Sequence, residues 1–109
     1  MSGIFVLISK EGCALIEVRV RKKRIRVSGH ARHAPPGQDI VCAGVTTLCQ
    51  TLIRSIESLT EDAIKYEISP GKADIQYGNL SESSKTLVDS FFIGVCMIAD
   101  EFPDHVRVV

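Results

Sequence analysis

The fold is decided by the stretch Leu15-Ile16-Glu17-Val18-Arg19-Val20-Arg21-Lys22-Lys23-Arg24-Ile25-Arg26-Val27-Ser28. Apolar and polar residues alternate on both sides of a basic turn, and this period is typical of half-buried β-strands. The alternation places Ile16, Val18 and Val20 of the first segment and Ile25 and Val27 of the second on one common face. The stretch therefore predicts a β-hairpin whose apolar face needs a covering layer.

Two segments further along the chain have helical rather than strand periodicity. The first begins after Asp39, a plausible N-cap, and carries an apolar stripe made of Val41, Val45, Leu48, Leu52, Ile56 and Leu59. The second runs from about Ser81 to Pro103 and carries a stripe made of Val88, Phe91, Val95, Ile98 and Phe102. Each stripe supplies an apolar helix face that can cover a sheet.

A second hairpin lies between the two predicted helices. Alternating apolar residues flank Ser69-Pro70-Gly71, with Tyr66 and Ile68 before this turn and Ala73, Ile75 and Tyr77 after it. Further strands are expected at Ile4–Ile8 and at the tail 106–109. We therefore predict an α+β fold with two helices packed on one face of a mostly antiparallel sheet built from hairpins, in a single domain spanning 1–109 in which 1–14 add an extra strand.

Composition limits the classes of function. The 109 residues are 45% hydrophobic, which suits one domain with its own core, and 13 Lys plus Arg balance 13 Asp plus Glu. A balanced charge gives no global attraction to nucleic acid or membranes. No apolar run approaches the ~20 residues of a membrane span, and Ile4–Ile8 lacks the basic start of a secretory signal, so we expect a cytoplasmic protein.

The four cysteines are Cys13, Cys42, Cys49 and Cys96, and they form neither a CxxC pair nor a zinc-ligand spacing. In a reducing compartment we expect free thiols. Nothing in the pattern implies a metal or a cofactor. Cys49 and Cys96 are interpreted as packing residues, which leaves Cys42 for closer inspection.

The candidate catalytic residues lie in the stretch Gly29-His30-Ala31-Arg32-His33-Ala34-Pro35-Pro36-Gly37-Gln38-Asp39-Ile40-Val41-Cys42-Ala43. His30 follows a strand, Gly29 and Gly37 bound a loop that we expect to be flexible, and Cys42 would be the third residue of the helix. A cysteine at a helix start lies near unpaired N–H groups and the positive end of the helix dipole, which favours a thiolate. Alone, Cys42 is more often a packing residue and His30 a surface residue. A strand–loop–helix arrangement can bring them together as nucleophile and base.

Gly29-His30-Ala31, followed by Gly37 and Asp39-Ile40-Val41-Cys42-Ala43, resembles the signature of the bacterial ribosomal-processing cysteine proteases. The resemblance covers about 15–109 and implies that His30 and Cys42 form the catalytic dyad. It further implies that a small cytosolic homodimer removes the N-terminal extension of a large-subunit ribosomal protein precursor, its peptide substrate, at an aromatic-rich sequence. No membrane or direct nucleic-acid partner is implied.

Three further residues are candidates for supporting the dyad. The N–H groups of Cys42 and Ala43 are candidates for an oxyanion hole, and the Thr46 hydroxyl lies four residues after Cys42 on the predicted helix. Asp39 is either a helix cap or a group that orients His30 or the substrate. His33 is interpreted as a loop residue.

Two other classes of function compete with the protease. Six of the 13 basic residues lie within 19–26, and this basic hairpin predicts an RNA- or ribosome-binding module, although a solvated sheet face is the more common reason for such a pattern. A catalytically silent dimerisation module, paired through an exposed strand edge, is the third possibility.

Overall fold

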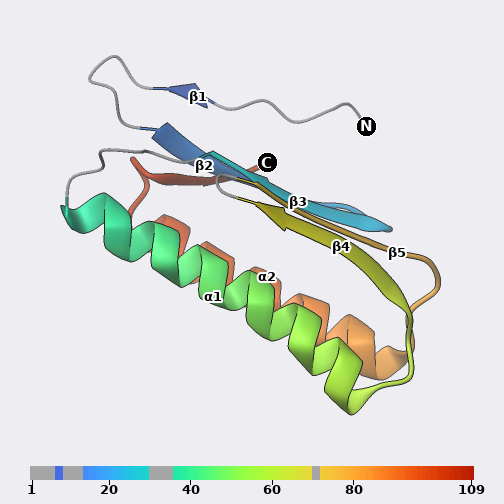
Figure 1. Ribbon diagram of the computed structural model, residues 1–109. Coiled ribbons are helices and arrows are strands. Elements are labelled where there is room, and N and C mark those ends of the chain that lie inside the picture. The colour runs from blue at the N-terminus through green and yellow to red at the C-terminus, as the bar shows by residue number, and fades with distance from the viewer. Residues whose placement is uncertain (1–6, 9–13, 30–35, 70–71) are drawn as a thin grey trace.

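The computed structural model describes residues 7–8, 14–29, 36–69 and 72–109 (Figure 1). Its elements, in chain order, are β1 (Leu7–Ile8), β2 (Ala14–Val20), β3 (Arg24–Ser28), α1 (Pro36–Leu59), β4 (Ile64–Ser69), β5 (Lys72–Tyr77), α2 (Glu82–Glu101) and β6 (Val106–Val108). Both predicted hairpins and both predicted helices are present. Of the strand expected at Ile4–Ile8, residues 4–6 lie outside the described part of the chain.

The strands form one mixed sheet in the order β1-β2-β3-β5-β4, with β6 also paired to β2. The β2–β3, β3–β5 and β4–β5 pairs are antiparallel, whereas β6 runs parallel to β2 with Ile16 opposite Val106. Figure 1 shows α1 and α2 side by side on one face of this sheet. The predicted α+β class, with two helices on one face of a mostly antiparallel sheet, is confirmed.

One hydrophobic core joins the helices to the sheet. The cross-strand register places Val18 opposite Val27 and Ile25 opposite Ile75, so these apolar side chains project from the same face. Ile25, Ile75 and Ile56 of α1 are each 0% exposed. In the alternating segment 15–28, Val18, Ile25 and Val27 therefore face the helices and are buried.

The start of α2 is hydrogen-bonded to Asp62, in the segment between α1 and β4. Ser81 is the N-cap, and its Oγ accepts a hydrogen bond from the Ser84 N–H at 3.3 Å. Asp62 Oδ2 accepts from the Ser81 N–H at 3.0 Å, from Ser81 Oγ at 2.7 Å and from Ser84 Oγ. The hydrogen bonds from Ser84 and Ser81 lower the pKa of Asp62. This cluster fixes the start of α2 at Ser81, which agrees with the predicted start of the second helix.

Candidate active site

The first wall of the candidate site is the end of β3. Gly29 has a φ of +116°, a conformation that residues with a side chain rarely adopt, and an added Cβ would lie 2.2 Å from the Leu15 carbonyl oxygen. Glycine therefore allows β3 to end directly against β2. His30, the next residue in the sequence, lies outside the described residues, as does His33.

The second wall is the N-terminal part of α1, which starts earlier than expected. The helix begins at Pro36, so the prediction of Asp39 as N-cap is wrong, and Gly37 lies in the first turn rather than in a loop. Proline is favoured at the first position of a helix because its fixed φ suits the helix and its missing N–H would have no partner there. Pro36 and Gly37, which belong to the segment predicted as a loop, are thus part of the helix start.

This shift changes the surroundings of Cys42. Counted from Pro36, Cys42 is the seventh residue of α1 and not the third. Backbone N–H groups beyond the first turn bond to the carbonyl four residues back, and the dipole effect weakens beyond that turn. The predicted use of the Cys42 and Ala43 N–H groups as an oxyanion hole, and the predicted dipole effect on the thiol, therefore lose their basis.

A cavity of about 560 Å³ lies between α1 and the sheet. Cys42, half-buried, lines it together with Thr46 one helical turn later and the exposed Ala43. The described residues that line it are Ile16, Val27, Gly29, Cys42, Ala43, Val45, Thr46, Thr47, Cys49, Ile68, Ser69, Lys72 and Ala73. A half-buried cysteine, a nearby hydroxyl and apolar lining residues make this cavity a candidate ligand-binding site.

Predicted site residues from two different elements meet in this cavity. Gly29 comes from the end of β3 and Cys42 from α1, and both line the same space. Thr46 and Ala43 also line it, whereas Asp39 belongs to the first turn of α1. The residue that precedes His30 therefore lies at the cavity that contains the Cys42 side chain.

The three described cysteines differ in accessibility. Cys42, Cys49 and Cys96 are all free thiols. Cys49 is 2% exposed, and burial raises its pKa to about 12, so it stays a neutral packing residue as predicted. Cys96 is half-buried on α2. Cys42 is thus the described cysteine that combines partial exposure with a place in the cavity wall.

Sequence reasoning missed the contribution of the second hairpin to this site. Ile68 and Ser69 of β4 and Lys72 of β5 line the cavity across from α1. Their sequence pattern indicated a hairpin but gave no link to the segment around Cys42. That link comes from the strand order, in which β5 lies next to β3.

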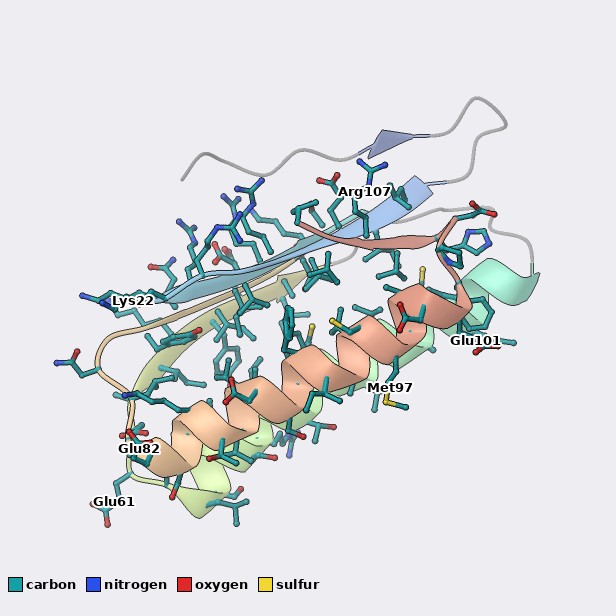
Figure 2. All side chains as sticks on the ribbon, turned by 180° about the vertical axis from the view of Figure 1, so that it is seen from behind. Lys22, Glu61, Glu82, Met97, Glu101 and Arg107 are labelled. Carbon is teal, nitrogen blue, oxygen red and sulfur yellow. The ribbon has the colours of Figure 1, made fainter. Side chains whose placement is uncertain are left out.

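The outer face of the sheet bears on the RNA-binding alternative. Arg24 Nε donates to Asp74 Oδ1 at 2.8 Å, and Arg24 Nη2 donates to Asp74 Oδ2 at 2.5 Å. Arg21 Nη1 donates to the backbone carbonyls of Val20 and Val109, each at 3.0 Å, and Arg19 is 7% exposed. Figure 2 shows Lys22 extending from the β2–β3 turn. Because these arginines have contacts within the protein, the hairpin offers less free positive charge than its composition indicates.

Across 7–8, 14–29, 36–69 and 72–109, no three His, Cys, Asp or Glu residues gather in a way that would hold a metal ion. Neither α1 nor α2 is long and apolar enough to span a bilayer.

The family model described as Cysteine protease Prp matches residues 15–107 of the chain. A search of curated proteins found no match. Among solved structures, the essential ribosomal processing protease Prp of S. aureus in complex with a substrate peptide has a TM-score of 0.77 and 19% sequence identity, covering 87% of this chain and 96% of that one.

Two more structures share the fold. SMU.848 of Streptococcus mutans has a TM-score of 0.74 and 24% identity, covering 91% of this chain and 94% of that one. S. aureus Prp with a covalently linked product peptide has a TM-score of 0.73 and 20% identity, covering 86% and 95%. Because the family model matches nearly the whole chain, from Leu15 to Arg107, the protein belongs to the cysteine protease Prp family.

Proposed function

We propose that this protein is an endopeptidase that removes the N-terminal extension of a large-subunit ribosomal protein precursor in the bacterial cytoplasm. The observation that carries the proposal is that the half-buried Cys42 lines the 560 Å³ cavity. Gly29, which directly precedes His30 in the sequence, lines the same cavity. The GHA and DIVCA motifs supply the two residue types that such chemistry needs. The S. aureus relative is a ribosomal processing protease, which supports the choice of substrate.

In the proposed mechanism, His30 takes the Cys42 proton and the thiolate attacks the carbonyl carbon of the scissile bond. The tetrahedral intermediate collapses when the imidazolium gives its proton to the departing amine, which leaves a thioester on Cys42. Water, deprotonated by His30, then hydrolyses the thioester and restores the thiol. We assign Thr46 a supporting role beside the thiol because it lines the cavity one turn after Cys42. For Asp39 we retain the proposal that it orients His30 or the substrate.

The test uses a synthetic peptide spanning the N-terminal extension of that precursor, taken from the organism that encodes this chain. Cys42→Ala and His30→Ala should each abolish cleavage while the circular dichroism spectrum stays unchanged. Cys96→Ala is the matched control, because it removes a half-buried thiol from α2 and should leave cleavage at the wild-type rate. Cleavage that persists in either dyad variant would refute the proposed mechanism.

We propose in addition that the protein acts as a homodimer. Light scattering coupled to size-exclusion chromatography measures this directly, and a mass of about 24 kDa, twice the 11.9 kDa of one chain, is expected. A mass of one chain across the micromolar range would contradict it.

A further inference from the structure

Strand β4, Ile64–Ser69, forms an edge of the sheet next to the cavity. Within the described part of the chain, β4 pairs with β5 through registers that run from Ile64 opposite Tyr77 to Ser69 opposite Lys72, and it has no strand on its other side. Alternate residues of an edge strand direct their N–H and C=O groups away from the sheet. The outer side of β4 is therefore a template for one more strand.

The side chains of β4 extend an apolar surface beyond the core. Tyr66 lies opposite Ile75 and Ile68 opposite Ala73, and residues directly opposite in a sheet project from the same face. Ile75 and Ala73 are buried in the core, yet Tyr66 is 49% exposed and Ile68 39% exposed. Two apolar side chains thus project from the helix-facing side of an edge strand without being covered, an arrangement that promotes aggregation unless a partner occupies it.

This apolar edge is continuous with the candidate active site. Ile68 and Ser69 line the same cavity as Cys42 and Thr46. Cys42 and Thr46 are four residues apart on α1 and so lie on the same side of the helix. Figure 1 shows β4 and α1 on the same side of the molecule, with α2 behind α1. An extended chain that paired with β4 would pass the end of the strand where the thiol lies.

We propose that the substrate polypeptide binds as an added β-strand on the outer edge of β4, with its scissile bond brought to Cys42. This inference rests on the proposed peptidase function and adds the mode of substrate binding. Main-chain hydrogen bonds to β4 hold the peptide irrespective of its sequence, and Tyr66 and Ile68 contact alternate side chains that project toward the helices. An extended peptide, rather than a second copy of this chain, is the occupant because the exposed pair leads directly into the cavity that contains the thiol.

The first experiment uses the precursor peptide described above and leaves the protein unchanged. N-methylation of single backbone amides, at positions at least two residues from the cleaved bond, removes one donor at a time. Strand pairing predicts that KM rises about tenfold at every second position and changes little at the positions between. A flat profile, or one without this alternation, would overturn the proposal.

Side-chain variants provide a second kinetic measurement. Tyr66→Ala and Ile68→Ala should each raise KM for the peptide about fivefold or more while kcat stays close to that of the wild type. Leu59→Ala is the matched control, because Leu59 is 71% exposed at the far end of α1 and should leave KM unchanged. Equal KM values for all three variants and the wild type would count against docking on β4.

Amide hydrogen exchange in the Cys42→Ala protein separates this inference from the proposed function. If the wild type cleaves the peptide but the peptide does not protect the β4 amides from exchange, strand addition is overturned and the proposed peptidase function stands. Protection of β4 by a peptide that the wild type does not cleave supports strand addition and refutes the peptidase. If the wild type does not cleave the peptide and the peptide does not protect β4, both the inference and the proposed function are overturned. If the β4 amides are protected without peptide, and more so as the protein concentration rises, a second copy of the chain binds this edge and the inference is overturned.

Discussion

Gly29 lies against the backbone of Leu15 so closely that a Cβ on Gly29 would be 2.2 Å from the Leu15 carbonyl oxygen and 2.9 Å from the Cα of Ile16. The chain leaves β3 at this contact and continues to His30. Because Gly29 also lines the cavity, the close approach of the two strands sets the position of one wall of the candidate active site.

Replacing Gly29 with alanine should therefore be costly. The added methyl group meets backbone atoms, which cannot rotate away as a side chain would, and the φ of +116° is itself unfavourable for alanine. We expect Gly29→Ala to lower the free energy of unfolding by about 3 kcal/mol or more. Urea denaturation followed by circular dichroism measures this change.

Gly78 supplies the matched control. A Cβ added there meets nothing within 4 Å, so Gly78→Ala should change the free energy of unfolding by no more than about 0.5 kcal/mol. Similar losses in the two variants would show that the contact between Gly29 and Leu15 does not constrain the fold.

The Arg24–Asp74 ion pair predicts a second difference in stability. Asp74 is 7% exposed, and the hydrogen bonds from Arg24 hold the pKa of its carboxyl below the usual range. Asp74→Ala should lower the Tm by about 2–4 °C, because it removes the hydrogen bonds from Arg24 to Asp74 while the exposed Arg24 guanidinium regains water as its partner. The control is Glu67→Ala, since Glu67 lies directly opposite Asp74 on β4 and is exposed. Equal Tm values for the two variants would contradict a stabilising role for the pair.

Asp62 predicts how stability depends on pH. Hydrogen bonds from Ser84 and Ser81 lower its pKa in the folded state, so the carboxylate stabilises the protein above the unfolded pKa of about 3.9. This contribution is lost as the pH falls through the lower folded pKa. Asp62→Asn should be less stable than the wild type at pH 7, and its Tm should fall less between pH 5 and pH 2.

Glu61→Gln tests whether that effect is specific to the cluster. Glu61 is the exposed neighbour of Asp62 and points away from the fold in Figure 2. Its substitution should leave the acid dependence of the Tm unchanged in calorimetry. If both variants gave the same profile, the cluster at the start of α2 would not be responsible.

Thiol alkylation should distinguish the cysteines of the cavity. Cys49 is 2% exposed with a pKa of about 12, so iodoacetamide at pH 8 should leave it unmodified in the native protein. Cys42, which is partly exposed, should react first, as peptide mass spectrometry can show. All the cysteines should react in urea. Native Cys49 reacting as fast as Cys42 would mean that the core opens readily.

Local patterns were sufficient for most of the fold. The alternation in 15–28 and 66–77 placed both hairpins, although only β5 of the second hairpin buries its apolar face, and the apolar stripe to Leu59 gave the end of α1 correctly. The start of α1 was wrong because Pro36 and Gly37 are compatible with both a loop and a first helical turn. The sequence alone does not separate these two possibilities.

The site was harder to predict because it depends on contacts between distant segments. Cys42 and Gly29 were candidates through their local context, and the cavity that they share follows from the packing of α1 on the sheet. Ile68 and Ser69 escaped notice because they reach the cavity through the order of β3, β5 and β4. Periodicity predicts which face of a strand is apolar but not which strands become neighbours.

The parallel pairing of β6 with β2 bears on how the protein is made. Arg21 bonds to the carbonyl of Val109 across 88 residues of sequence, and Val106, 2% exposed, completes the core against Ile16. Contacts of such high sequence separation slow folding because a long loop must close before they form. On the ribosome, the sheet stays incomplete until residues 106–108 have emerged from the exit tunnel.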